Sequence, residues 1–397
     1  MQKLVVVAQF YSGLDSIIDS NHWEHSGSPA YYHFVSQLDS SSNFDYQLFL
    51  LSTKLSKNIV SKKIFFDNLK NPAMIIPYYP FVFSSSVNFF KKIEFFYNKI
   101  RQYYFVLRNS HSAKCYYVDR DNLLLSALLL LFTRKKVITR LLGVTDILYG
   151  HLVKKKNLYS KLIRWVFDHP RSHFVCTKDG SYAELVEEKV GKERFRLLFN
   201  GVNKVKGRSY SHKENNEKVN IIYLSRIEPN KGHIDFLNAI AKSNLSHRLE
   251  VIFVGDGSLR GDCIKLANNI GVGESVHFVG RLSHEKAMIY LKKADLFLSL
   301  NNDGSLGNGV LEAAQFGLPI VTLLHPGCLT DDLNLFQVIK QNQDLQNNVA
   351  DFLNRFLDNS SLRESMSNNS FEFSKHCLVS WEERMDIEFR FIKNICG

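Results

Sequence analysis

The feature that most constrains the fold is a repeated alternation of short apolar runs with amphipathic stretches. The runs are nearly continuous in Val, Ile, Leu and Phe, which is typical of strands buried on both faces of a parallel sheet. They predict strands at 4–8, 46–51, 115–118, 136–140, 173–176, 219–224, 249–254, 276–278, 295–299 and 319–323. The alternation therefore predicts an α/β fold with doubly wound, Rossmann-like sheets.

The length of 397 residues favours two domains over one small core. A polar stretch rich in Asn, Lys and Ser interrupts the alternation before it restarts at Val219. We predict a first domain at 1–202, a linker at 203–218, a second domain at 219–379 and a closing helix at 380–397. Two such domains would face each other across a cleft, because open α/β sheets bind ligands outside the carboxyl ends of their strands.

Composition indicates a globular protein, with 45% hydrophobic and 22% charged residues. The longest apolar run, 123–132, is far shorter than the roughly 20 residues that span a bilayer, so it predicts a buried strand or helix. The N-terminal stretch resembles a first buried strand more than a signal peptide. The six cysteines form no metal-binding or redox spacing, which favours reduced thiols and a cytoplasmic location.

The net charge of +11 lies in the first half of the chain, where residues 1–200 hold 28 Lys and Arg against 16 Asp and Glu. Such a half would attract polyanions: nucleic acid, anionic lipid headgroups or a phosphorylated substrate. The alternative is a basic surface that only aids solubility. No nucleic-acid-binding signature is present, so we expect no nucleic-acid partner.

Residues 87–108 mix aromatic side chains with Lys and Arg. One interpretation is a helix that lies on an anionic membrane, with rings in the interface and cations at the headgroups. The other is a helix that packs on the core and has a basic outer face. Three consecutive lysines at 154–156 add to the first interpretation.

Two cations follow the predicted strand 219–224, on either side of Glu228 and Pro229. Arg226 and Lys231 would lie in the loop and at the start of the next helix, where free backbone N–H groups and the helix dipole also favour an anion. Arg can bind two oxygens at once, and Lys supplies a mobile point charge. A solvated surface pair is the alternative for this stretch alone.

Further turns at strand ends support a ligand site. Gly255 follows the strand 249–254, where a glycine permits close backbone approach to a ligand. Arg281 and Leu282 end the next strand, and their main chain could meet a flat base. A glycine-rich turn then leads into a helix that carries Glu312, a carboxylate suited to two neighbouring sugar hydroxyls.

Five segments in residues 196–325 resemble glycosyltransferase family 4, a group of retaining, nucleotide-sugar-dependent transferases with the GT-B fold. They are "LLFNGVN", "YLSRIEPNKG", "VGDGS", "VHFVGRL" and "GNGVLEAAQFGLPIV". The first half resembles the family only in its βαβ rhythm and in "HFVCTKDGSYAEL". The resemblance implies three catalytic residues, Arg226, Lys231 and Glu312. Arg226 and Lys231 would hold the donor diphosphate, and Glu312, the second Glu of the E-x7-E motif, would bind the ribose. The donor-binding residues implied are Gly255, Arg281, Leu282, Asp303, Gly304, Ser305, Leu306, Gly307, Asn308 and Glu312.

The sequence departs from the family at two places. The first Glu of E-x7-E falls at Gly304, and Asp303 and Asn308 are candidate stand-ins. A His that many members carry in the first domain is absent from "ITRLLGV", which has Arg140 and Gly143 instead. Either change is expected to alter sugar or acceptor preference, or to reduce activity, while the diphosphate site remains.

The acceptor-side candidates lie in the first domain: Gly13, Gly27, Arg120 and Arg140. "DRD" at 119–121 has the DxD shape that metal-dependent transferases of another fold use to hold a cation, but a loop that contacts the acceptor is the preferred interpretation. His22, His25 and His33 lack further ligands at metal spacing and are expected to be polar loop and helix residues. We therefore predict no metal site.

The sequence predicts a metal-independent glycosyltransferase without a cofactor. It would move a sugar from a nucleoside-diphosphate sugar to a glycan or lipid-linked glycan acceptor, with retention, in bacterial surface polysaccharide biosynthesis (lipopolysaccharide, O-antigen, capsule or exopolysaccharide). An anionic membrane surface is a candidate partner, which would make the protein peripheral on the inner face of the cytoplasmic membrane. Two alternatives stay open: a sugar-nucleotide epimerase of the same fold, and a catalytically degenerate donor-binding subunit.

Overall fold

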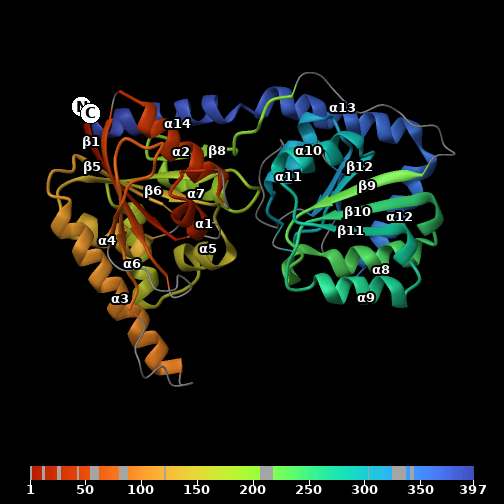
Figure 1. The fold of residues 1–397 in the computed structure, drawn as a ribbon, viewed down its shortest axis with the longest axis horizontal. Coiled ribbons are helices and arrows are strands. Elements are labelled where there is room, and N and C mark those ends of the chain that lie inside the picture. The colour runs from red at the N-terminus through yellow and green to blue at the C-terminus, as the bar shows by residue number, and fades with distance from the viewer. Residues whose placement is uncertain are drawn as a thin grey trace. The chain divides into compact units, whose positions relative to one another are not determined.

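The computed structural model divides the chain into two compact units (Figure 1). Unit 1 comprises Met1–Thr177, Val186–Leu198 and Trp381–Gly397, and unit 2 comprises Lys178–Leu185 and Phe199–Ser380. The residues that the structure describes are 2–10, 14–24, 28–42, 44–53, 62–79, 88–119, 122–205, 218–302, 304–323, 337–339 and 344–397. Most of the predicted linker, together with Gly13, Gly27, Arg120 and Asp303, lies outside them.

Unit 1 is built on an eight-stranded sheet with the order β3-β4-β2-β1-β5-β6-β7-β8. All neighbouring strands are parallel except β3 and β4, which are antiparallel. The strands are β1 (Gln2–Gln9), β2 (Phe44–Leu51), β3 (Lys62–Ile64), β4 (Ala73–Ile76), β5 (Cys115–Val118), β6 (Lys136–Leu141), β7 (Ser172–Thr177) and β8 (Phe195–Leu198). The chain order reverses between β1 and β5, which makes that pair the switch point of this sheet.

Helices connect these strands. They are α1 (Leu14–Ser20), α2 (Pro29–Ser40), α3 (Asn88–Asn109), α4 (Leu123–Phe132), α5 (Asp146–Val153), α6 (Leu158–Asp168) and α7 (Ala183–Val190), of which α7 crosses the boundary between the units. The apolar run 123–132 is α4, and it is mostly buried. Among the described residues, no helix combines the length and the apolarity needed to cross a bilayer.

Unit 2 has a six-stranded sheet, all parallel, with the order β11-β10-β9-β12-β13-β14. The strands are β9 (Val219–Leu224), β10 (Leu249–Val254), β11 (Val276–Gly280), β12 (Leu296–Ser299), β13 (Ile320–Leu323) and β14 (Gln337–Ile339). The helices are α8 (His233–Ser243), α9 (Arg260–Asn269), α10 (His284–Lys293), α11 (Asn308–Gln315), α12 (Leu345–Asp358) and α13 (Ser360–Cys377), with short 3-10 turns at η1 (Pro229–Lys231), η2 (Ser246–Arg248) and η3 (Gly273–Ser275). Successive residues of β9 face different cores: Ile221 packs with α8 and α12, and Ile222 packs with α10 and α11.

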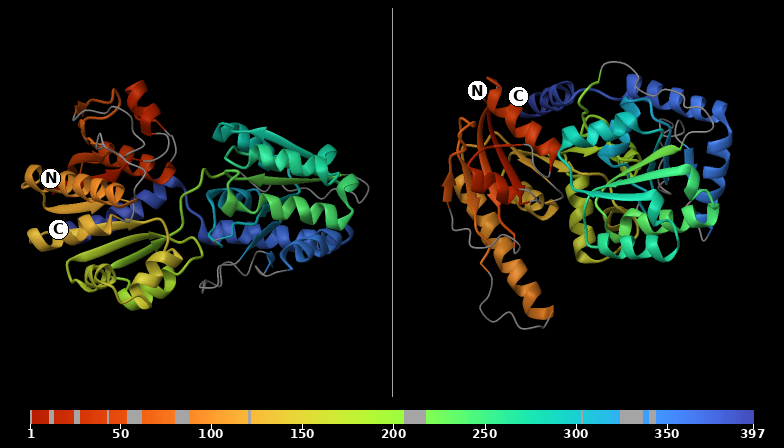
Figure 2. Two further views of the ribbon diagram at one scale, coloured as in Figure 1. Left: turned by 90° about the horizontal axis from the view of Figure 1, so that it is seen from below. Right: turned by 45° about the vertical axis from the view of Figure 1, so that its right-hand side comes forward.

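The last helix, α14 (Trp381–Cys396), completes the core of unit 1 (Figure 2). Its Trp381, Met385 and Ile392 belong to the core that also contains residues of β1, β2 and β5. Its Arg384 and Glu388 are both fully buried and form an ion pair, and the hydroxyl of Tyr117 donates a hydrogen bond to Glu388. The closing helix is thus anchored to the first sheet by both apolar and polar contacts.

The strands expected from apolar runs are all present, and the predicted α/β fold with parallel sheets is confirmed. The apolar runs do not predict β3, β4, β8 and β14. These strands lie at or next to the edges of the sheets. They are only three or four residues long, and β3 and β8 contain Lys or Arg. Short edge strands with charged residues carry little of the apolar signal that marks a central strand.

Candidate functional site

The switch point of the second sheet lies between β9 and β12, where the chain order reverses. Ligands of open α/β sheets bind at such a point, outside the carboxyl ends of the strands. The loops that follow β9 and β12 meet there, and the N–H of Asn302 donates to the carbonyl oxygen of Asn230 at 2.8 Å. The candidate site is built from these two loops and from those that follow β10 and β11.

Lys231 connects the two loops at the switch point. Its Nζ donates a hydrogen bond to Oδ1 of Asn301 at 2.9 Å. The amide nitrogen of Asn301 in turn donates to the carbonyl and hydroxyl oxygens of Ser305, at 2.8 and 2.9 Å. Asn301 is buried and Lys231 is half-buried. The ammonium group is therefore held at a defined position and does not move freely in solvent.

Two buried rings support this arrangement. The hydroxyl of Tyr223 donates to the carbonyl of Lys231 and accepts from the N–H of Leu300 at 2.6 Å, so one group fixes both loops. His233 packs against Tyr223 with ring centroids 4.5 Å apart. Burial lowers the pKa of His233 to about 4, and the charge of Lys231 contributes. The imidazole is therefore neutral at neutral pH, and the charge at the switch point belongs to Lys231.

Glycines permit the close approach of these loops. A Cβ added at Gly232, whose φ is +69°, would lie 2.2 Å from the carbonyl oxygen of Leu300. One added at Gly255, whose φ is +146°, would lie 1.9 Å from the carbonyl oxygen of Ser225. Neither position accepts a larger residue without backbone movement, so the shape of the carboxyl edge depends on both.

We expect Gly232→Ala to lower the free energy of unfolding by about 3 kcal/mol, because the left-handed conformation and the backbone clash act together. Gly271→Ala is the matched control. Gly271 has a φ of +75° but nothing within 4 Å of an added Cβ, so only the conformational cost of about 1 kcal/mol applies. Urea unfolding of both variants measures the difference, and equal losses would contradict the packing argument.

Arg226 lies in the same loop as Lys231, and its side chain is exposed. Its positive charge acts on the carboxylate of Glu228 without a hydrogen bond between the two side chains. Glu228 instead accepts from Oγ and N of Ser258, at 2.6 and 3.3 Å, in the loop after β10. These bonds lower the pKa of Glu228, and Arg226 contributes. The loop is thus fixed through Glu228, and the guanidinium is open to an anionic ligand.

The other predicted donor residues line the same edge. The N–H of Gly255 donates to the carbonyl oxygen of Gly280 at 2.9 Å, which joins the ends of β10 and β11. Arg281 and Leu282 follow β11 directly; Arg281 is exposed, and Leu282 packs partly on the core.

The segment from the end of β12 to the first residue of α11 holds five more of these described residues, one of which is Ser305, the partner of Asn301. The N–H of Gly304 donates to the carbonyl of Asn301, and that of Leu306 to the carbonyl of Asp179, both at 2.8 Å. Gly307 is the N-cap residue of α11, and Asn308 accepts from the amide of Asn200 at 2.8 Å. Gly304 has a φ of +65°. This left-handed conformation disfavours a Glu, which is the residue that the E-x7-E motif has at this position.

Glu312 lies on the second turn of α11 and is mostly buried. Its Oε1 is 2.9 Å from Nε2 of His284, the first residue of α10. The hydrogen bond to Glu312 raises the pKa of His284, and the charges of Glu312 and Glu285 contribute, although partial burial opposes them.

Of the four predicted acceptor-side residues, Arg140 is the one that lies within the described part of the chain. Arg140 is 1% exposed, with its NH1 3.8 Å from Oδ1 of the equally buried Asp119. An acceptor would not reach this guanidinium in the structure as it stands. The segments that hold Gly13 and Arg120 follow β1 and β5, which are neighbours at the switch point of the first sheet. The roles of all four acceptor-side residues remain predictions.

Sequence reasoning misses Asn301 and His284. Asn301 is the residue that contacts Lys231, whereas the sequence favours Asp303 or Asn308 as the stand-in near the donor sugar. The available signals are weak: Asn301 is a polar residue directly after a strand, and His284 follows Ser283, a helix N-cap. Neither signal identifies the residue that is contacted, because Lys231 and Glu312 lie in other parts of the sequence.

The outer face of α3 is apolar over residues 93–104, and the basic side chains of this stretch point inward. Lys99 is buried, with Nζ 3.2 Å from Oε1 of Gln9, and burial lowers its pKa to about 8. Arg101 stacks on Tyr79 with its guanidinium carbon 3.8 Å from the ring centroid. The cations of Lys99 and Arg101 therefore form neither the basic outer face nor the headgroup contacts that the two interpretations of 87–108 expected from them. The exposed side chains at helical spacing are Ile93, Phe96, Tyr97, Ile100 and Tyr104, each between 42 and 65% exposed.

The apolar face of α3 has neighbours of the same kind. Tyr159 of α6 lies close enough to Tyr103 of α3 to contribute, after burial, to a raised pKa of Tyr103. Beside Tyr159, Leu158 is 83% exposed, and Val153 at the end of α5 is 57% exposed. Lys154, Lys155 and Lys156 lie between them and are all exposed. We call this set, from Ile93 to Tyr104 and from Val153 to Tyr159, the apolar–basic surface.

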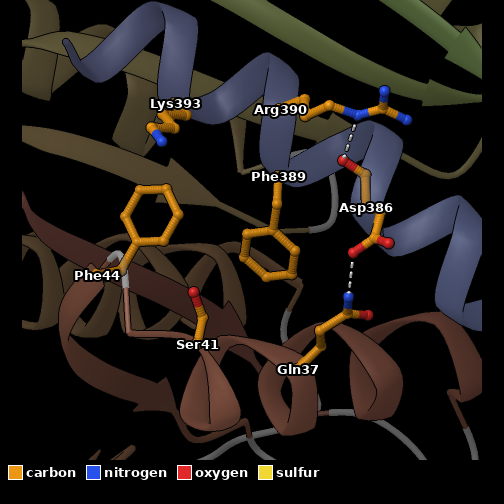
Figure 3. A pocket seen from close by; sticks show the side chains of 7 residues that line it. All are labelled: Gln37, Ser41, Phe44, Asp386, Phe389, Arg390 and Lys393. Carbon is orange, nitrogen blue, oxygen red and sulfur yellow. Dashed lines mark hydrogen bonds between the residues drawn. The ribbon is translucent and has the colours of Figure 1, made fainter.

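A separate cavity of about 450 Å³ lies between α2, the first residue of β2 and α14 (Figure 3). Gln37 of α2 donates to Asp386 of α14 across it at 2.5 Å, and Arg390 and Lys393 line it from α14. Because Phe44 begins β2, the cavity is at the amino-terminal edge of the first sheet. Ligands of such sheets bind at the opposite edge, so we assign the cavity no donor or acceptor role.

Residues 208–373 match the family model of Glycosyl transferases group 1. Over 167 residues, the chain is 28% identical to the phosphatidylinositol N-acetylglucosaminyltransferase GPI3 subunit of Saccharomyces cerevisiae (strain YJM789). That match covers 40% of this chain and 37% of the subunit, so the chain spans well under half of this relative.

Solved structures are similar over nearly the whole chain. Sucrose-phosphate synthase from Thermosynechococcus elongatus has a TM-score of 0.69 at 13% identity, covering 100% of this chain and 99% of that one. Anabaena Alr3699/HepE in complex with UDP has a TM-score of 0.64 at 13% identity, with 99 and 100% covered. WaaG, a glycosyltransferase involved in lipopolysaccharide biosynthesis, has a TM-score of 0.62 at 16% identity, with 98 and 99% covered.

Likenesses at such low identity show the fold, which is that of the GT-B glycosyltransferases. The group 1 match covers β9 to β14, including the loops at the switch point of the second sheet. The chain is thus similar to glycosyltransferases in two ways: in the fold of nearly its whole length and in the group 1 match of residues 208–373.

Proposed function

We propose that this protein transfers a glycosyl group, with retention, from a nucleoside-diphosphate sugar to a glycan or lipid-linked glycan acceptor. The observation that carries the proposal is the position of Lys231, fixed by Asn301 at the switch point of the second sheet. Anabaena Alr3699/HepE, which has a similar fold, is described in complex with UDP. A uridine nucleotide is therefore the first donor to test.

The chemistry follows from the charges at the site. Departure of the diphosphate develops negative charge, and the cations of Lys231 and Arg226 would stabilise that charge more in the transition state than in the ground state. Arg226 is exposed and can bind two phosphate oxygens. In this proposal protein cations fill the role that a metal ion has in other transferases, so no metal is required.

Glu312 is the proposed ribose-binding residue. Its carboxylate is mostly buried, and a buried acceptor fixed by a neighbour can discriminate a vicinal diol from an analogue that lacks one hydroxyl. The main chain at Arg281 and Leu282 is the proposed base-contacting segment, since it follows β11 at the same edge.

The acceptor is proposed to be lipid-linked because of the apolar–basic surface of unit 1. Exposed rings on α3 suit the membrane interface, and the three lysines between α5 and α6 suit anionic headgroups. A peripheral location on the inner face of a bacterial cytoplasmic membrane and a role in surface polysaccharide biosynthesis complete the proposal. The likeness to WaaG supports this pathway class.

A panel of nucleotide sugars tests the donor proposal. The cognate donor is expected to raise the melting temperature of the protein, because a ligand that binds only the native state stabilises it by mass action; at 100 times Kd the gain is about 2.7 kcal/mol. The same donor should be consumed in the presence of a membrane extract. Interconversion of free sugar nucleotides would instead indicate an epimerase, and binding without turnover would indicate a donor-binding subunit.

A further inference from the structure

His284, which contacts the proposed ribose-binding residue Glu312, has no role in the scheme above. His284 begins α10, and its Nε2 contacts Oε1 of Glu312 on α11 at 2.9 Å. The two residues come from different helices on one face of the second sheet. The contact with His284 uses Oε1, which is one of the two carboxylate oxygens of Glu312.

We infer that His284 is a positioning residue, which holds Glu312 in the rotamer that receives the two ribose hydroxyls of the donor nucleotide. The inference rests on the proposed function and extends it to a residue that does not itself touch substrate. An oxygen of a carboxylate has two lone pairs, so Oε1 can accept from His284 and from one hydroxyl together, while Oε2 accepts from the other. A fixed carboxylate also loses less side-chain freedom when the donor binds.

The surroundings of His284 favour the protonated, positively charged form of its imidazole, which donates a hydrogen bond to Glu312. Ser283 caps α10 by accepting from the N–H of Lys286, which fixes the first turn of the helix. The charged groups that act on the imidazole are Glu312 from α11 and Glu285 from α10, and both favour the imidazolium. The ion pair is thus fully present below the ordinary imidazole pKa of about 6.5 and is lost as the pH rises through the raised pKa of His284.

The sheet offers a matched control pair. His277 on β11 contacts Glu250 on β10 with Nε2 and Oε1 2.7 Å apart. Both residues are the second of their strands, so this pair lies at the amino-terminal edge of the sheet, opposite the candidate site. Any general effect of removing a surface histidine from unit 2 should appear equally in both pairs.

The test is donor kinetics of His284→Ala, His284→Gln and His277→Ala between pH 5.5 and 8.5. His284→Ala is expected to raise the KM for the donor about fivefold with kcat within about twofold, because a ribose contact is made equally in the ground and transition states. His284→Gln retains an N–H donor and cannot titrate. The KM of the wild-type protein is expected to rise with pH as the ion pair is lost. His284→Gln should have a KM near the low-pH value of the wild type, and this KM should not rise with pH. His277→Ala should match the wild type.

A second readout does not need the donor. The imidazole resonances of His284 in the apo protein, followed by NMR, should titrate above pH 6.5, and Glu312→Gln should move that titration down. An unchanged KM in His284→Ala, or a pH dependence retained in His284→Gln, overturns the inference while the proposed function stands. If no nucleotide sugar binds the wild-type protein, the proposed function has failed, and the ribose role of this pair fails with it.

Discussion

Replacing Lys231 by Ala is expected to lower kcat for glycosyl transfer by about 100- to 1000-fold, the loss typical of removing one fixed donor to a developing negative charge. Lys231 is held by Asn301 at 2.9 Å, and its carbonyl is fixed by Tyr223, so in the proposed site the ammonium is already in a defined position before the donor binds. The measurement is the initial rate of transfer at saturating donor, with circular dichroism to show that the variant is folded.

The control for this prediction is Lys242→Ala. Lys242 is a lysine of α8 whose Nζ contacts Oδ1 of Asn347 at 3.1 Å, a geometry close to that of the Lys231–Asn301 pair but away from the switch point. It should leave kcat unchanged. Full activity in folded Lys231→Ala would remove the basis of the proposed function, because the leaving group would then be stabilised elsewhere.

Replacing Lys154, Lys155 and Lys156 together by Gln is expected to weaken binding to anionic vesicles about 100-fold. Each lysine near an anionic surface contributes about 1 kcal/mol, and the three are exposed between the apolar ends of α5 and α6. Sedimentation with vesicles that contain about 30% phosphatidylglycerol measures the change, at low salt because salt screens such attraction.

The matched control removes three lysines from α10 in unit 2: Lys286, Lys292 and Lys293, all exposed. It changes the net charge by the same amount, so it separates the local surface from the overall charge of +11. Equal loss of binding in both triple variants, or no binding of the wild type, would contradict the membrane proposal. Ile100→Ser, which removes an exposed apolar side chain from α3, should weaken binding about tenfold or more.

Much of the fold could be predicted from the sequence because its central strands are buried on both faces. Runs such as 219–224 and 249–254 carry that burial as continuous apolar residues, and they coincide with β9 and β10. The outward face of α3 could not be predicted. From composition alone, either the aromatic or the basic residues of α3 could face outward. The contacts of Lys99 with Gln9 and of Arg101 with Tyr79 decide that the aromatic residues do.

The candidate site was predictable in part for a related reason. The position of Lys231 follows from where β9 ends, which is a local property of the sequence. Its contact with Asn301 depends on β9 and β12 being neighbours, and the two residues are 70 positions apart. The pairing of His284 with Glu312 likewise requires α10 and α11 to pack on one face of the sheet. Strand order and helix placement are long-range properties that periodicity does not encode.

The membership of α14 in the first core has a consequence for protein synthesis. The ribosome releases Trp381, Met385 and Ile392 only after all of unit 2 has been made, yet these residues fill the core of unit 1 together with β1 and β5. Until α14 is made, unit 1 lacks these apolar residues and also Glu388, which accepts from the hydroxyl of the buried Tyr117. The core of unit 1 is therefore completed only after unit 2 has been synthesised.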